Sequence, residues 1–182
     1  MSLKTTDLIS ADYLVTQKVL HATPRGYGAG GHVWAPTVLE LVTRYQASAV
    51  LDYGAGRGTL GAALRLAGVE CREYDPAIAG LDTRPSFADL VTCTDCLEHI
   101  EPDRLDRVLA HLRQLARRAV FLVIATRPSN KTLLDGRNAH LIVKDAAWWQ
   151  ARVVAAGFTL EAPPGVPPAK PQPPCWVAVV RP

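Results

Sequence analysis

The fold of this chain can be inferred first from the residues Val50-Leu51-Asp52-Tyr53-Gly54-Ala55-Gly56-Arg57-Gly58. It is an apolar run that reaches an acid and continues into three glycines at every second position. Glycine accepts the sharp dihedrals of a tight turn and lets backbone amides approach a nucleotide-like ligand closely. The stretch therefore predicts a buried strand that leads into a cofactor-binding loop.

The length and composition of the chain predict one domain. It has 182 residues, of which 48% are hydrophobic, and a formal net charge of +3. We expect a single domain over residues 1–182, with N-terminal helices and a glycine-rich loop in residues 1–46 and the core of the domain in residues 47–182. This positive charge is small and its signs are interspersed, so the sequence does not predict a nucleic-acid partner. No membrane partner is expected either, because no apolar run approaches the roughly 20 residues of a spanning helix.

Cysteine usage bears on the cellular compartment. The four cysteines are Cys71, Cys93, Cys96 and Cys175, and no secretory pattern opens the sequence. We therefore expect reduced thiols and a cytoplasmic protein. Cys93 and Cys96 have the spacing of a redox or zinc pair, but only two further cysteines remain as ligands, so this is the weaker hypothesis.

Strand-like and helix-like patterns alternate along the chain. Strands are expected at residues 49–53, 69–74, 89–94, 120–125, 158–161 and 176–180, and helices at residues 8–20, from Pro36 onward, and at 59–67, 101–117 and 145–156. The last two strands should pair across a stiff loop, residues 162–174, that holds seven prolines. This pattern predicts an α/β fold with a doubly wound, mostly parallel, Rossmann-like sheet and helices on both faces. Only fourteen residues, 76–89, separate the second and third strands, so the sheet should be shortened there.

Three stretches, taken in order, resemble the class I S-adenosylmethionine-dependent methyltransferase family. They are the glycine-rich stretch from Asp52 to Gly58, the acid in Tyr74-Asp75-Pro76, and Ala88-Asp89-Leu90-Val91-Thr92-Cys93-Thr94-Asp95-Cys96-Leu97-Glu98-His99-Ile100. The last of these resembles the strand and Leu-Glu-His helix start of the small-molecule branch. The resemblance covers roughly residues 26–162 and implies transfer of a methyl group from S-adenosylmethionine to a small-molecule acceptor, with S-adenosylhomocysteine as product. Residues 76–89 depart from the family pattern, because the usual third strand and its helices do not fit there.

The resemblance and the chemistry of S-adenosylmethionine together indicate the cofactor residues. Asp75, at the end of the second strand, is placed to accept both ribose hydroxyls. Asp52 can anchor the loop or contact the cofactor ammonium, and Tyr27 lies with His32 in a glycine-rich segment expected to form a lid. The candidate cofactor-binding residues are Asp52, Gly54, Gly56, Gly58, Asp75, Pro76, Thr94 and Tyr27.

Two alternatives of other classes stay open. Gly56-Arg57-Gly58-Thr59-Leu60-Gly61 also satisfies the dinucleotide fingerprint, which would make the chain a NAD(P)-dependent oxidoreductase. That hypothesis assigns no functional role to Asp52, Gly54 or the Leu-Glu-His stretch. The shortened segment and the lack of an unambiguous base would also suit a non-catalytic S-adenosylmethionine-binding protein.

Two histidines are the candidate catalytic residues. Methyl transfer from a sulfonium depends mainly on orientation and desolvation, and a general base is often optional. If one is used, His99 at the Leu-Glu-His stretch and His140 in the polar loop after the fourth strand are the candidates.

Asp95, Glu98, His99 and His140 could also bring metal-ligand groups together. This set resembles the metal cluster of methyltransferases in which a divalent ion binds adjacent hydroxyls on small RNA ends or quinone precursors. Magnesium, manganese or zinc would suit the mixed oxygen and imidazole groups. The preferred explanation of Asp95 and Glu98 is a capping box at a helix start, which needs no metal.

Overall fold

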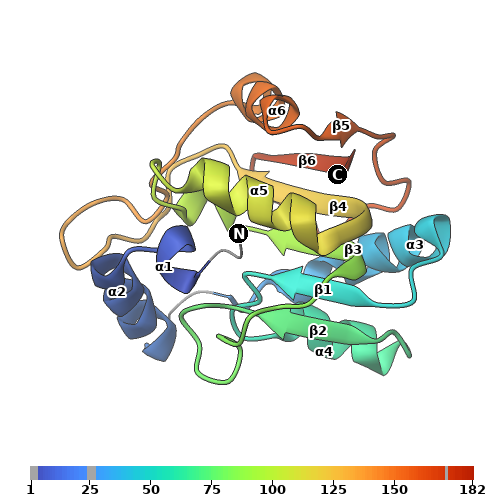
Figure 1. Cartoon of the computed structure of the whole chain (residues 1–182), viewed down its shortest axis with the longest axis horizontal. Helices are drawn as coiled ribbons and strands as arrows, with labels where there is room; N and C mark the ends of the chain where they lie inside the picture. Colours follow the sequence, from blue (N-terminus) through green and yellow to red (C-terminus); the bar gives the residue numbers. More distant parts are fainter. Residues whose placement is uncertain (1–3, 24–27, 171) are drawn as a thin grey trace.

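The computed structural model describes residues 4–23, 28–170 and 172–182 and is built on one six-stranded sheet (Figure 1). The strands are β1 Val50–Tyr53, β2 Cys71–Tyr74, β3 Ala88–Thr94, β4 Ala116–Ala125, β5 Thr159–Leu160 and β6 Cys175–Arg181. Their order across the sheet is β2-β1-β3-β4-β6-β5. The first four are parallel, whereas β6 is antiparallel to both β4 and β5. The predicted mostly parallel α/β sheet and the predicted pairing of the last two strands are confirmed.

Helices cover both faces of the sheet, as predicted. The helices α3 Ala35–Tyr45 and α4 Thr59–Leu66 pack on one face through a core that includes Trp34, Leu41 and Phe121. The helices α5 Leu105–Leu115 and α6 Ala146–Ala155 pack on the other face through a core that includes Leu109 and Trp149. Because every long strand is covered on both sides, its side chains are almost continuously apolar, as is typical of parallel sheets.

Two predicted boundaries are wrong around α5. The helix expected at residues 101–117 begins only at Leu105, because residues 102–104 form turns, and it ends at Leu115. The strand expected at residues 120–125 begins four residues earlier, at Ala116. Ala116 pairs with Ala88 on β3, and the Arg118 guanidinium lies 3.7 Å from an Asp89 carboxylate oxygen. Pairing with β3 thus extends β4 through a charged segment.

The predicted shortening after β2 is confirmed. Among the described residues the sheet ends at β2, and residues 75–87 fold as turns and loop beside it. The Asp75 amide donates to the Leu81 carbonyl at 3.0 Å, which closes this segment on itself. The Arg72 guanidinium donates to the Phe87 carbonyl at 3.0 Å and holds the far end of the segment at the sheet edge.

The single helix expected at residues 8–20 is two helices, α1 Thr5–Leu8 and α2 Ala11–Ala22. The two helices are separated at Ser10. Its hydroxyl accepts from the Tyr13 amide as the N-cap of α2, and its own amide donates to the Glu101 carboxylate at 2.8 Å. After the undescribed residues 24–27, a short 3-10 helix, η1 Gly31–Trp34, leads into α3. No helix in the described part of the chain is long and apolar enough to cross a membrane.

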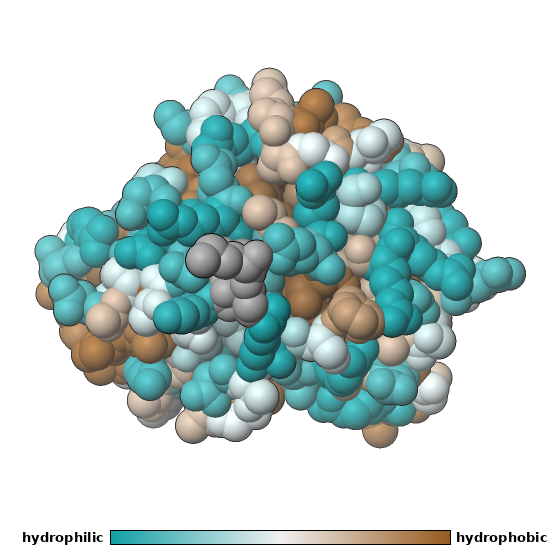
Figure 2. Space-filling model, in the orientation of Figure 1, coloured by the Kyte–Doolittle hydropathy of each residue, from teal (hydrophilic) through white to brown (hydrophobic). Residues whose placement is uncertain are grey.

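The molecular surface seen in Figure 2 is mainly hydrophilic, with separate apolar patches. One patch lies at the left of this view, where Figure 1 shows α2. That helix exposes Val15 and Val19, one turn apart.

The described proline-rich residues, 162–170 and 172–174, form a loop without regular structure, as predicted. The Ala169 amide donates to the Val33 carbonyl at 2.7 Å, and Arg44 donates to the carbonyls of Ala162 and Pro163. These bonds tie the loop to η1 and α3. Gln172 and Pro173, near its end, reach the rim of the cavity described next.

Candidate functional site

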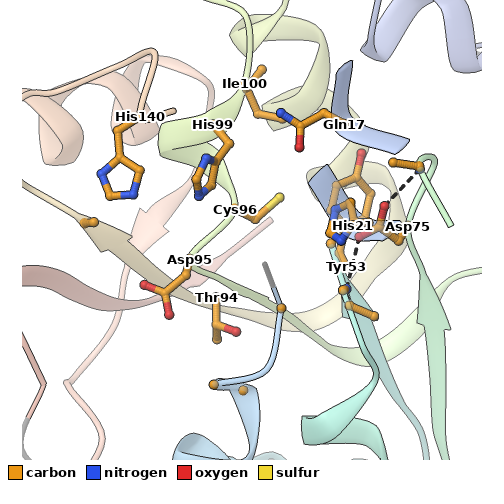
Figure 3. Close-up of a pocket in the computed structure, with 18 of the residues that line it drawn as sticks. Gln17, His21, Tyr53, Asp75, Thr94, Asp95, Cys96, His99, Ile100 and His140 are labelled. Atoms are coloured by element: carbon orange, nitrogen blue, oxygen red, sulfur yellow. Dashed lines mark hydrogen bonds between the residues drawn. The ribbon is translucent and has the colours of Figure 1, made fainter. Parts of the chain in front are cut away.

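A cavity of about 340 Å³ opens at the carboxyl ends of the parallel strands (Figure 3). Ligands of open α/β sheets bind at this edge. The cavity has a floor made by the glycine-rich loop after β1 and by the segments after β2 and β3, while α1 and α2 lie over it. The predicted residues that line it are Asp52, Gly54, Gly56, Asp75, Pro76, Thr94, His99 and His140. Their roles stay predictions.

Close contact between two glycines shapes the cofactor loop. Gly56 has a φ of 55°, and a Cβ added there would lie 2.5 Å from the Gly28 Cα. The Arg57 amide donates to the Gly28 carbonyl at 3.1 Å. The segment before η1 therefore crosses directly over the loop, and glycine is required on both sides of the crossing. The sequence indicated a flexible glycine-rich segment there but gave no sign of this contact.

Gly58 does not share the position of the other predicted glycines. It lies outside the cavity lining, at the N-cap of α4. A Cβ added there would lie 2.6 Å from a Glu73 carboxylate oxygen. Its observed task is to start α4 and to pack against β2. Tyr27, also predicted to contact the cofactor, lies outside the described residues.

The Asp75 carboxylate organises the loop from the end of β2. One oxygen accepts from the Gly56 amide at 3.0 Å, and the other accepts from the Ala77 amide at 2.9 Å. Each carboxylate oxygen has a second lone pair, so both can still accept from a ligand hydroxyl. Asp75 therefore fixes the glycine loop and faces the cavity at the same time, as the dashed bonds in Figure 3 show.

Asp52 is buried beneath the loop and accepts from the Thr92 hydroxyl at 3.0 Å. Burial raises the pKa of its carboxyl to about 7, with smaller contributions from Glu73 and Asp75, and the Thr92 bond opposes this shift. The cavity thus contains a carboxyl group that a ligand cation would help to ionise.

His99 and His140 stand together at the other end of the cavity (Figure 3). Their rings meet edge to face with centroids 4.7 Å apart. The Nδ1 atom of His99 lies 2.8 Å from the Ala139 carbonyl oxygen, and that of His140 lies 2.6 Å from the Arg127 carbonyl oxygen. Burial lowers both pKa values, that of His99 to about 3, so both rings are neutral near pH 7.

The capping-box explanation of Asp95 and Glu98 is wrong. The Leu-Glu-His stretch is a separate 3-10 turn, η2 Leu97–His99, whose N-cap is Cys96 and makes no side-chain cap bond. The Glu98 carboxylate instead accepts from the Ala125 amide of β4 at 3.1 Å. Burial raises the pKa of Glu98 to about 8, with a further contribution from Asp95. The Glu98, His99 and His140 side chains each place one ligand-type atom within 4.8 Å of the others.

The roof of the cavity comes from residues that sequence reasoning missed. Tyr13 and Gln17 of α2 line the cavity, and the Tyr13 hydroxyl donates to the His99 carbonyl at 2.7 Å. Arg127 and Lys131, from the loop after β4, line it on another side. The helical pattern of α2 predicted a flank or a lid, but it did not indicate which side chains face the site.

The two cysteines of the proposed redox pair have different surroundings. Cys96 lines the cavity, whereas Cys93 is fully buried in β3. A hydrogen bond to Cys96 and burial raise the pKa of the Cys93 thiol well above its usual range. Redox and metal-binding cysteines react as thiolates, so this environment does not favour either role.

Comparison with known proteins identifies the class. A family model described as "Methyltransferase domain" matches residues 28–161. The chain therefore belongs to the methyltransferase-domain family, and the predicted class of S-adenosylmethionine-dependent methyltransferase is confirmed. No curated protein sequence matches the chain.

Solved methyltransferase structures share the fold. DhpI in complex with S-adenosylhomocysteine matches with a TM-score of 0.61 and 20% identity, over 93% of this chain and 96% of that chain. The 1,6-didemethyltoxoflavin N1-methyltransferase of Burkholderia thailandensis matches with a TM-score of 0.66 and 20% identity, over 93% and 88% of the two chains. Magnesium protoporphyrin IX methyltransferase from Synechocystis matches with a TM-score of 0.59 and 15% identity, over 97% of each chain. At these identities the likeness concerns the fold alone.

Proposed function

We propose that this protein transfers the methyl group of S-adenosylmethionine to a small-molecule acceptor. The observation that carries the proposal is a single cavity with two chemically different ends. One end has the glycine loop and the Asp75 carboxylate, and the other has His99 and His140. A cofactor bound at the first end could direct its sulfonium toward an acceptor at the second.

The groups at the first end match the chemistry of S-adenosylmethionine. The Asp75 oxygens retain acceptor capacity for ribose hydroxyls. The Gly28 and Gly56 crossing gives a ligand close access to the backbone, and Asp52 offers a carboxyl group for a cationic amino group. These assignments give a role to Asp52, Gly56 and Asp75, while the predicted residues Gly54, Pro76 and Thr94 also line the cavity.

The second end favours a small acceptor. Leu8, Ile9 and Tyr13 lie over the cavity, so an acceptor must fit beneath α1 and α2. The 1,6-didemethyltoxoflavin and magnesium protoporphyrin IX methyltransferases among the structural matches are named for small-molecule acceptors. Enclosure also removes water, which strengthens the electrostatic interactions that guide methyl transfer.

Calorimetry with S-adenosylhomocysteine tests the cofactor half of the proposal without knowledge of the acceptor. We expect micromolar binding by the parent protein and a loss of about 2 kcal/mol, roughly thirtyfold, in Asp75→Asn, the scale of hydrogen bonds to a charged group. Asp82→Asn is the matched control, because Asp82 is an exposed acid in the segment that follows. A thermal shift by NADH that exceeds the shift by S-adenosylhomocysteine would instead support the oxidoreductase alternative.

Radioactivity from methyl-labelled S-adenosylmethionine tests the transfer itself across a panel of small hydroxyl, amine and carboxylate acceptors. Transfer to at least one acceptor supports an enzyme. Tight cofactor binding without transfer to any of them would favour the non-catalytic alternative.

A further inference from the structure

We propose that Glu98, His99 and His140 form a binding site for one divalent transition-metal ion at the acceptor end of the cavity. The three side chains come from two separate places in the chain, since η2 supplies Glu98 and His99 and the loop before α6 supplies His140. The fold brings one ligand-type atom of each to within 4.8 Å of the other two. The site itself does not depend on the proposed methyl transfer, but its use in catalysis does.

The histidine hydrogen bonds fix which nitrogen of each ring carries the proton. A carbonyl oxygen can only accept, so the Nδ1 atoms of His99 and His140 carry the ring protons in their bonds to Ala139 and Arg127. The unprotonated nitrogen of each ring is then Nε2. Metal-binding histidines almost always have this arrangement, in which the second nitrogen donates to a carbonyl or carboxylate and fixes the ring.

The Glu98 carboxylate has a buried oxygen atom that no hydrogen bond among the described residues accounts for. Its side chain is fully buried, and one carboxylate oxygen accepts from the Ala125 amide. The other oxygen, Oε2, is buried and has no hydrogen-bond partner in the part of the chain that the structure describes. An unsatisfied buried oxygen is costly, and a bound cation would satisfy it.

The donor set indicates the kind of ion. Two imidazole nitrogens and one carboxylate suit zinc, manganese, iron or cobalt better than calcium, which prefers oxygen ligands only. Asp95 is a candidate for a fourth ligand. It lines the same cavity, has a left-handed φ of 50°, and lies on the same side as the two histidines in Figure 3.

The position of the site suggests its use in the proposed reaction. His99, His140 and Asp95 line the cavity, so an ion held there would face the acceptor. A bound divalent ion lowers the pKa of a coordinated hydroxyl and fixes its direction. We therefore expect acceptors that offer an oxygen ligand, and the two histidines would act by holding the ion rather than as bases.

Metal binding is tested on the full chain after removal of metal with EDTA. Titration with Mn²⁺, followed by electron paramagnetic resonance, and with Co²⁺, followed by visible absorption, should show one ion per chain. Affinity should fall at least about tenfold in Glu98→Gln and in His140→Ala, since even indirect metal partners contribute on that scale. Glu98→Gln preserves an acceptor for the Ala125 amide. His32→Ala is the matched control, because His32 is an exposed histidine outside the cluster, and its affinity should equal that of the parent.

The outcomes separate this proposal from the proposed function. Equal affinity in His140→Ala and His32→Ala, or no stoichiometric binding of Mn²⁺, Co²⁺ or Zn²⁺ by a parent protein that binds S-adenosylhomocysteine, would overturn the metal site and leave the methyltransferase proposal intact. Metal binding that depends on Glu98 and His140, in a protein that does not bind S-adenosylhomocysteine, would support the metal site and contradict the cofactor proposal. Circular dichroism of each variant shows whether it remains folded.

Discussion

The two ends of the cavity are built in different ways. The cofactor end rests on backbone contacts of the glycine loop after β1, where Gly56 lies against Gly28 and donates to Asp75. The acceptor end is assembled from side chains of distant segments, with Tyr13 bonded to the His99 carbonyl and Glu98 bonded to the Ala125 amide. Changes at the first end should therefore affect folding and cofactor binding together, whereas changes at the second should leave the fold largely unaffected.

The largest effect is expected from the ionisation of Asp52. Its pKa is about 7 in the folded protein because of burial and about 3.8 in the unfolded chain. The folded protein thus holds a proton that the unfolded chain has lost, so this group makes stability fall as the pH rises from about 4 to about 7. We predict that the free energy of unfolding of Asp52→Asn, measured in urea, rises relative to that of the parent between these two pH values. The rise should reach up to about 4 kcal/mol, at 1.36 kcal/mol per pKa unit. A difference that does not change with pH would contradict this.

A smaller but still large effect is expected from Gly56→Ala. The added Cβ would lie 2.5 Å from the Gly28 Cα, at a φ of 55° that alanine adopts at a cost. We predict a loss of about 3 kcal/mol in the free energy of unfolding, together with loss of S-adenosylhomocysteine binding.

Gly30→Ala is the matched control for this prediction, because a Cβ there would meet no atom within 4 Å. It should change stability by less than about 0.5 kcal/mol. Equal effects of the two substitutions would show that the crossing of the two glycines does not hold the cofactor end together.

The smallest effect is expected at the roof of the acceptor end. Tyr13→Phe removes the hydroxyl that donates to the His99 carbonyl at 2.7 Å, which should cost about 1 kcal/mol of stability. S-adenosylhomocysteine affinity, measured by calorimetry, should change little, because Tyr13 belongs to the other end of the cavity. A loss of cofactor affinity as large as that of Gly56→Ala would remove the distinction between the two ends.

The sequence predicted the fold well where the signal was local. Apolar runs marked the strands of the sheet, glycines marked the loop after β1, and Asp145 marked the start of α6, whose first turn it caps. The missed boundaries depend on distant partners. Ser10 breaks the N-terminal helix with help from Glu101, and Ala116 joins β4 by pairing with Ala88.

The same division explains which parts of the site could be predicted. Asp75 and Gly56 follow strand ends and carry a recognisable motif, and the structure brings them together. The burial of Glu98 depends on the Ala125 amide, 27 residues further along the chain. A pattern of nearby residues therefore suggested a capping box, whereas the tertiary structure places the same carboxylate beside two histidines.

We propose that one cavity holds the cofactor at one end and the acceptor at the other. A crystal structure with S-adenosylhomocysteine tests it most directly. We predict that the ribose hydroxyls contact Asp75 and that the sulfur atom faces His99 and His140. S-adenosylhomocysteine bound outside this cavity, or bound within it with its sulfur turned away from the two histidines, would contradict the claim.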